Sequence, residues 1–151
     1  MKEKYLKLAL SEAKKSLSYG EIPIGAVIVK DDIVIAKAHN TKENKKCSIY
    51  HAEINAIIKA CKKINNWRLD HCDIYISFEP CPMCASAIRQ SRIDNVYSAL
   101  KNSNIDNTKI VEKIFSCSDI NHKVSFYNDL MHETGEKIIN DFFCSKRNKK
   151  I

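Results

Sequence analysis

Glycine and proline are scarce in this sequence, with three residues of each in 151. No stretch rich in glycine, proline or serine divides the chain, and no segment is repeated, so the sequence predicts a single domain over residues 1–151. A chain of this length can bury a hydrophobic core without disulfides. The hydrophobic share of 44% and the charged share of 28% are ordinary for a globular protein and exclude a low-complexity chain.

Long apolar segments are also missing. The chain starts with Met1-Lys2-Glu3-Lys4 and continues with charges throughout, which fits neither a signal peptide nor a membrane span. The seven cysteines are an odd number without a regular framework, unlike those of a disulfide-stapled secreted domain. We therefore expect a cytoplasmic protein with no membrane contact.

Acidic residues are too few to balance the basic ones. Lysine and arginine number 25 against 18 aspartates and glutamates, giving a formal net charge of +7. Such an excess suits a polyanionic partner such as nucleic acid. Asparagine and isoleucine are abundant beside lysine, however, and a genome can favour this composition generally. Charge alone therefore leaves the partner open.

One histidine and two cysteines form a metal-binding pattern. His51-Ala52-Glu53 is followed later by Pro80-Cys81-Pro82-Met83-Cys84. Imidazole and thiolate are ligands that Zn²⁺ prefers, and three protein ligands leave the fourth position open, as in catalytic zinc sites. Glu53 is not needed as a ligand and can take a proton from water and pass it on. The H-x-E…P-C-x-x-C arrangement is the general signature of zinc deaminases. The sequence therefore predicts one zinc per chain, held by His51, Cys81 and Cys84, with Glu53 as the catalytic residue.

Two other interpretations explain parts of this pattern. A C-x-x-C pair alone is typical of a redox site. A closed structural zinc site needs a fourth ligand, for which the candidates are Cys47, Cys61, Cys72 and His71. None of these four has a partner at ligand spacing, and a structural site has no use for Glu53.

The spacing of apolar residues predicts a layered α/β domain with the order helix, hairpin, helix, strand, helix, strand, helix. The expected elements are a helix over 6–17 ending near Gly20, strands over 24–29 and 33–38 joined by Asp31-Asp32, a helix from His51 with Ile54, Ile57, Ile58 and Cys61 facing inward, a strand over 74–78, a helix from Pro82, a strand over 96–100, a short helix over 108–115, a strand over 124–127, and a C-terminal helix that ends in the basic run 146–150. Both metal half-sites fall at helix N-termini, so we expect these two helices side by side on one face of the sheet.

On these residues the chain resembles the cytidine deaminase-like superfamily and, within it, the bacterial tRNA-specific adenosine deaminases. The resemblance covers residues 8–147, nearly the whole chain. It is carried by residues 21–27, Asn40, 51–54, 66–69, 79–85, 91–93, 121–124 and 141–143. The last two segments are the most specific, because deaminases of free bases and nucleotides share the zinc motif.

The resemblance implies a three-layer cytidine deaminase-like fold, with a central five-stranded mixed sheet flanked by helices, in a homodimer. It implies zinc-dependent hydrolysis of the wobble adenosine of a tRNA to inosine, with release of ammonia and with the anticodon stem-loop as partner. It gives zinc ligation to His51, Cys81 and Cys84 and proton transfer to Glu53. The substrate-binding positions that it implies are Ile22, Asn40, Ala52, Glu79 and Pro80, and the nucleic-acid-binding positions are His122, Phe142, Phe143, Lys146 and Arg147. By helical periodicity, at least one of the two phenylalanines belongs to the core.

Two segments that border the substrate in the family depart from its pattern. Cys47-Ser48-Ile49-Tyr50 replaces the usual Asp-Pro-Thr-Ala, and Lys101-Asn102 stands where Arg-Asp is usual, without the glycine-rich stretch that follows it. Tyr50 can serve as a stacking surface at the pocket mouth or as a core aromatic. The first alternative function is therefore a deaminase of a small free base or nucleoside, of the guanine or cytosine type, on the same fold. The second is a zinc-stabilised nucleic-acid-binding module without turnover.

Overall fold

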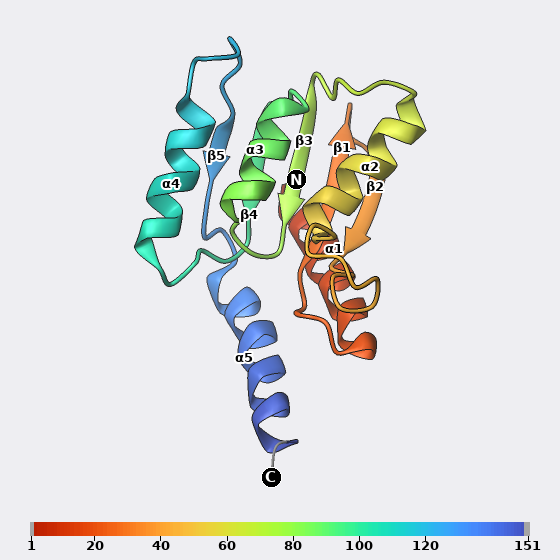
Figure 1. The fold of residues 1–151 in the computed structure, drawn as a ribbon, viewed down its shortest axis with the longest axis vertical. Helices are drawn as coiled ribbons and strands as arrows, with labels where there is room; N and C mark the ends of the chain where they lie inside the picture. The colour runs from red at the N-terminus through yellow and green to blue at the C-terminus, as the bar shows by residue number, and fades with distance from the viewer. Residues whose placement is uncertain (1, 150–151) are drawn as a thin grey trace.

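A mixed sheet of five strands forms the centre of the computed structural model, which describes residues 2–149 (Figure 1). The elements in chain order are α1 (Lys2–Lys15), the 3₁₀ helix η1 (Ser16–Tyr19), β1 (Gly25–Lys30), β2 (Ile33–His39), α2 (Ala52–Ile64), β3 (Cys72–Ile76), α3 (Pro82–Gln90), β4 (Asn95–Ser98), α4 (Ile105–Ser116), β5 (Ser125–Tyr127) and α5 (His132–Asn148). The strand order is β2-β1-β3-β4-β5, with β1 antiparallel to both neighbours and β3, β4 and β5 parallel. The predicted α/β fold with a five-stranded mixed sheet is confirmed.

The predicted hairpin forms from β1 and β2. Residues of β1 from Gly25 to Val29 are buried, as expected for a continuous apolar run in the middle of a sheet. Asp31 and Asp32 both have left-handed backbone, with φ of 50° and 60°, which is the geometry of a two-residue hairpin turn. Gly25 is required by close packing, because a Cβ there would lie 2.2 Å from the carbonyl oxygen of Ala9 in α1. The hairpin and α1 therefore pack with almost no gap.

Helices cover both faces of the sheet. One hydrophobic core lies between the sheet and helices α2, α3 and α4, and contains Ala56, Ile74, Ile88 and Phe115. The second core joins α1, through Leu6 and other side chains, to the opposite face of the sheet, with Ile138 of α5 packed against it. Four tyrosines form a row on this face, one from α1 and one each from β3, β4 and β5, and the first three belong to the second core. The ring centroids of Tyr5, Tyr75, Tyr97 and Tyr127 follow one another at 5.0, 4.8 and 4.9 Å.

Helix α2 corrects one prediction. The face predicted to point inward, with Ile54, Ile57, Ile58 and Cys61, is only partly correct. Ile57 and Cys61 are half-buried and pack against the core, whereas Ile58 is 41% exposed. The buried face instead carries Ala52, Glu53, Ala56 and Ala60. Alanines four residues apart form a smooth stripe, which lets α2 lie closer to β1 and β2 than isoleucines would allow.

Two other helix boundaries also differ from the predictions. Helix α1 ends at Lys15, so Leu17, predicted as the last residue of this helix, lies in η1 and is exposed, although the chain does turn at Gly20 with φ of 69°. Helix α4 starts three residues before the predicted residue 108, because the Asn104 side chain caps it by accepting a hydrogen bond from the Asp106 amide. The remaining predicted elements are present within a few residues.

The carboxyl ends of β3, β4 and β5 lie at the same edge of the sheet, because the three strands are parallel. The loop that follows β3 leads directly into α3, and helix α5 extends away from this edge (Figure 1). Over the described part of the chain, no helix combines the length and apolar character needed to cross a membrane.

Candidate metal and active site

Three side chains from two helix starts meet at one point. His51 is the residue before α2 and Cys81 the residue before α3, both with extended backbone, while Cys84 lies in the first turn of α3. The His51 Nδ1 atom lies 3.7 Å from the Cys81 Sγ and 3.5 Å from the Cys84 Sγ. All three potential ligand atoms lie within 4.8 Å of one another, so they could hold one metal ion. The prediction that both half-sites sit at helix N-termini is confirmed.

The two cysteines differ in their proton affinity. The pKa of the Cys81 thiol is lowered to about 4, chiefly because the Cys84 thiol donates a hydrogen bond to it and because His51 lies beside it. The same hydrogen bond, together with burial, raises the pKa of Cys84. The pKa of His51 is raised, mainly by its hydrogen bond to Cys81. A cation among these groups would take the place of the shared proton, because metal ligation deprotonates thiols.

The set of donors suits a borderline-soft divalent ion with an open coordination position. Within residues 2–149, no fourth histidine, cysteine, aspartate or glutamate joins His51, Cys81 and Cys84. Cys47, Cys61 and Cys72 are free thiols outside this group. The geometry therefore does not support a closed structural site.

Glu53 is a buried carboxyl beside this group. It lies in the first turn of α2, two residues after His51, and only 3% of its surface is exposed. Burial raises the pKa of the Glu53 carboxyl, while a hydrogen bond with the Cys84 side chain opposes that effect. A carboxyl with a raised pKa can both accept and return a proton near neutral pH.

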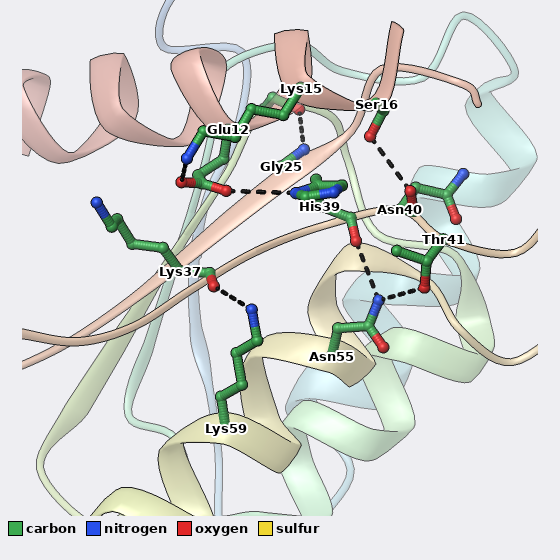
Figure 2. A network of polar contacts seen from close by, with 11 residues as sticks. Glu12, Lys15, Ser16, Gly25, Lys37, His39, Asn40, Thr41, Asn55 and Lys59 are labelled. Atoms are coloured by element: carbon green, nitrogen blue, oxygen red, sulfur yellow. Dashed lines mark hydrogen bonds and ion pairs between the residues drawn. The ribbon is translucent and has the colours of Figure 1, made fainter. Parts of the chain in front are cut away.

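Asn40 and Ile22 lie together, and the Thr41 amide, directly after Asn40, donates a hydrogen bond of 3.0 Å to the carbonyl oxygen of Tyr50, the residue before His51. Asn40 follows β2 and is buried, and its Nδ2 lies 3.5 Å from the Ile22 carbonyl oxygen. Ser16 donates a hydrogen bond of 3.3 Å to the Asn40 carbonyl oxygen. On the other side, the Asn55 side chain of α2 donates to the His39 carbonyl oxygen and to Thr41 Oγ1, both at 3.0 Å (Figure 2). The backbone around Asn40 is thus fixed from both η1 and α2.

Glu79 and Pro80 are held by residues outside the predicted site. The Glu79 carboxylate is buried and accepts hydrogen bonds from Asn107, Thr108 and Asn128, the one from Thr108 at 2.7 Å. Asn107 also donates to the Pro80 carbonyl oxygen at 3.2 Å. These partners come from α4 and from the segment after β5, far from Glu79 in the sequence, and no local pattern identifies them. They fix the segment that leads to Cys81.

The predicted nucleic-acid-binding residues fall into two separate places. In α5, Phe142 is only 6% exposed and Phe143 is 45% exposed, which confirms that one of them belongs to the core. Phe143, Lys146 and Arg147 line a shallow hollow with Asn140, and the Lys146 ammonium lies 5.0 Å from the Phe142 ring centroid. Of the basic run after them, Lys150 lies outside the described residues.

His122 does not join the α5 residues. It precedes β5, and its ring Nε2 pairs at 2.8 Å with the carbonyl oxygen of Ile93, which precedes β4. Both partners lie at the amino ends of their strands, whereas Cys81 follows the carboxyl end of β3. The structure therefore places His122 at the sheet edge opposite the metal-ligand group.

Comparison with known proteins identifies similar chains. A sequence model described as MafB19-like deaminase matches residues 1–147. The "tRNA-specific adenosine deaminase" of Aquifex aeolicus is 38% identical over 150 residues, which are 99% of each chain.

Two solved structures are also similar. One, from a study of A-to-I editing by tRNA:A34 deaminases, is 32% identical with a TM-score of 0.82, and the match covers 90% of this chain and 99% of that one. The other, a guanine deaminase from Bacillus subtilis, is 33% identical with a TM-score of 0.66, and the match covers 97% of this chain and 93% of that one.

Proposed function

Because this chain belongs to the MafB19-like deaminase family, we propose that it hydrolyses the wobble adenosine of a tRNA to inosine and releases ammonia. The observation that carries this proposal is the convergence of His51, Cys81 and Cys84 beside the buried carboxyl of Glu53. The 38% identity with the tRNA-specific adenosine deaminase of A. aeolicus, over almost the whole of both chains, supports the choice of reaction. The enzyme is accordingly a hydrolase acting on an amidine carbon.

Zinc is the metal that we assign to the three ligands. One nitrogen and two sulfur donors with an open position are typical of catalytic zinc. When bound, the ion would supply hydroxide at neutral pH, by lowering the pKa of water to about 7. We treat residues 1–151 as one zinc-dependent deaminase domain.

Glu53 is the group that moves protons in this proposal. The carboxylate takes a proton from the attacking water and gives it to the ring nitrogen next to C6, while the water oxygen forms its bond to C6. The carboxylate next takes the remaining proton of that oxygen, now a hydroxyl on C6, and passes it to the amino group as the C6–N bond breaks and ammonia leaves. One carboxyl suffices for both transfers because it regains its proton from the same water.

The target adenosine needs a polar contact and a shaped wall. Asn40 offers its side-chain amide. Among residues 2–149, the Asn40 Nδ2 has a single hydrogen bond, a long one of 3.5 Å to the Ile22 carbonyl oxygen. Ala52 is fully buried at the start of α2, and Ile22, Glu79 and Pro80 complete the set proposed to bind the nucleotide. An anticodon loop presents its bases unstacked, so the enzyme avoids the few kcal/mol that extrusion from a duplex costs.

The anticodon stem-loop would also contact α5. Phe143 offers an exposed ring, and Lys146 and Arg147 offer charge in the same hollow. Phe142 supports this surface from the core side, with Lys146 over its ring. His122 lies at the opposite edge of the sheet, so the RNA contact proposed for it needs a surface separate from α5.

We also propose a homodimer in the cytoplasm. Isoleucines are exposed on α4, at Ile105 and Ile110, and such side chains favour burial against a partner. The described cysteines are all free, which fits a reducing compartment where tRNA is present.

A second candidate is deamination of a free base, because the B. subtilis guanine deaminase is 33% identical over nearly the whole chain. We prefer tRNA as the substrate because the TM-score is higher for the tRNA:A34 deaminase, 0.82 against 0.66. A free-base deaminase also has no use for the basic end of α5.

One experiment separates these functions. The zinc-loaded protein is incubated with an anticodon stem-loop carrying adenosine at the wobble position, with the same RNA carrying cytidine there and another adenosine elsewhere in the loop, and with free guanine, cytosine and adenine. We expect inosine and ammonia from the first RNA alone. Ammonia from a free base with unchanged RNA would overturn the proposal.

A further inference from the structure

A cavity of about 300 Å³ lies between α2, the edge strand β2 and the loop after it, and none of its lining residues belongs to the metal-ligand group. It is lined by residues of three segments, including Thr41, Lys45 and Tyr50 of the loop after β2, and Asn55, Lys59 and Lys62 of α2. Figure 2 shows Asn55, Lys59 and Thr41 on one side of α2, where α2 faces β2. The volume is within the range of small-ligand sites.

The cavity is strongly positive. Three of its lining residues are lysines and no carboxylate lines it. Among the described residues, none of these three lysines forms an ion pair, although Lys59 donates a hydrogen bond of 3.0 Å to the Lys37 carbonyl oxygen. Glu12 is the carboxylate bonded to the lining residue His39, at 3.4 Å, and it also pairs with Lys15 at 2.7 Å (Figure 2). The charge of the three lysines is therefore available to an anion.

An aromatic ring lies beside this charge. The Tyr50 ring is half-buried in the cavity wall, with the Lys45 ammonium 5.1 Å from its centroid. Asn55 holds the wall together through its bonds to His39 and Thr41. A flat ring for a base and ammonium groups for a phosphate are the two components of a site for single-stranded nucleic acid.

The position of the cavity relates it to the reaction. Tyr50 is directly followed by the ligand His51, and consecutive Cα atoms are about 3.8 Å apart. A nucleotide on Tyr50 would therefore be close to one whose base reaches the metal-ligand group.

We propose that this cavity binds a nucleotide flanking the target adenosine in the same RNA strand, with its base on Tyr50 and its phosphate on Lys45, Lys59 and Lys62. The inference rests on the proposed function and names a further contact of that substrate. A free base has no phosphate and leaves this site empty, so the cavity contributes to selection of RNA over small substrates. Tyr50 also belongs to the segment 47–50, which departs from the family pattern.

The test uses the zinc-loaded full chain and kcat/KM for an anticodon stem-loop measured at several salt concentrations. The variant Lys45→Gln/Lys59→Gln/Lys62→Gln should reduce the log–log salt slope by about 2, at about 0.7 for each lost phosphate contact. Its kcat at saturating RNA should stay unchanged. The control Lys14→Gln/Lys63→Gln/Lys113→Gln removes the same charge from exposed lysines outside the cavity, and should change the slope far less.

Variants of Tyr50 test the base contact independently of the lysines. Tyr50→Ala should weaken RNA binding about 5- to 100-fold, the usual loss for one base stacked on an aromatic ring, and Tyr50→Phe should retain binding. Lysine acetylation of the wild type, followed by mass spectrometry, should show that RNA protects Lys45, Lys59 and Lys62 more than Lys14, Lys63 and Lys113. Because this measurement uses the wild type, it tests RNA binding at the cavity even if the triple variant does not fold.

The outcomes separate the two proposals. Inosine formation by the wild type with equal slopes for both triple variants would overturn the cavity site alone. A lower molecular mass of the lysine variant in light scattering, with an unchanged slope, would assign the cavity to a second copy of the chain and also overturn it. Turnover of free bases without turnover of RNA would overturn the proposed function and this inference together.

Discussion

Glu53 combines deep burial with a raised pKa beside a group of metal ligands. Because it is not one of the three ligands, its removal should stop proton transfer without releasing the ion. We expect Glu53→Ala to lower kcat by about 10²–10⁴-fold or more. Metal analysis should still find one zinc per chain. Near-normal turnover would mean that another group moves the protons.

Cys84 and Cys72 form a matched pair for testing the zinc site. Both are buried cysteines, but only Cys84 belongs to the metal-ligand group. Cys84→Ala should lose zinc and activity, because the remaining two ligands do not complete the site. Cys72→Ala should keep both and lose only some stability through the small cavity that it leaves. Zinc retained in full by Cys84→Ala, measured by elemental analysis, would reject the assigned ligand set.

The residues of the metal-ligand group could be predicted because their spacing is a local property. His51 and Glu53 are two residues apart and Cys81 and Cys84 three apart, so one helix start positions each pair. The partners of Glu79 could not be predicted in this way. Asn107, Thr108 and Asn128 reach it only after α4 and β5 are in place, and asparagine and threonine are common in polar loops.

At the scale of elements, periodicity located the helices and strands but not always the buried face. In α2 the isoleucines are expected to form the core side, but Ile57 is only half-buried against the core, and the fully buried apolar positions are alanines. Periodicity and hydrophobicity favour isoleucine for the buried face. The short distance between α2 and the sheet, which cannot be read from the sequence, favours the smaller side chain. Ile58 is thereby left at the surface.

The start of α5 depends on an ion pair that titrates. Asp129 Oδ1 lies 2.7 Å from His132 Nδ1, and this hydrogen bond raises the pKa of His132 above its ordinary 6.5. Burial opposes ionisation of Asp129, but its bond with His132 still lowers the pKa of Asp129 below 3.8. A raised histidine pKa stabilises the fold fully below pH 6.5, and this contribution is lost as pH rises through the folded-state pKa.

Asp129→Asn tests the direction of this pH dependence. Asparagine tolerates the left-handed backbone at this position, where φ is 62°. We expect the variant to be more destabilised relative to wild type at pH 5.5 than at pH 8.5, in urea unfolding at both values. A nuclear magnetic resonance titration should show the His132 pKa falling toward 6.5. Equal destabilisation at both pH values would show that the pair does not contribute through charge.

At the scale of the whole molecule, the exposed isoleucines of α4 bear on assembly. Ile105 is 67% exposed and Ile110 is exposed as well, on the same side of the sheet as α2. We expect the protein to have the mass of a dimer in light scattering at micromolar concentration. Ile110→Glu should shift the mass toward the monomer if α4 contributes to the interface. A monomeric wild type would reject the homodimer.

The last prediction concerns the basic end of α5, which projects from the body of the molecule (Figure 1). Lys146 and Arg147 are exposed beside Phe143, and terminal charges of this kind are often only solvated. If they hold the RNA backbone, Lys146→Gln/Arg147→Gln should reduce the log–log salt slope of RNA binding by about 0.7–0.9 per lost phosphate contact. Catalysis at saturation should be spared, so kcat/KM should fall while kcat does not.

Lys137 provides the control on the same helix, since it is exposed but already paired with Asp141 at 2.9 Å. Lys137→Gln should leave the slope almost unchanged. A chain ending at Cys144 should reduce the slope at least as much as the double variant, because it also lacks Lys149 and Lys150. If the truncated and full-length proteins have identical slopes, the end of α5 has no part in RNA binding.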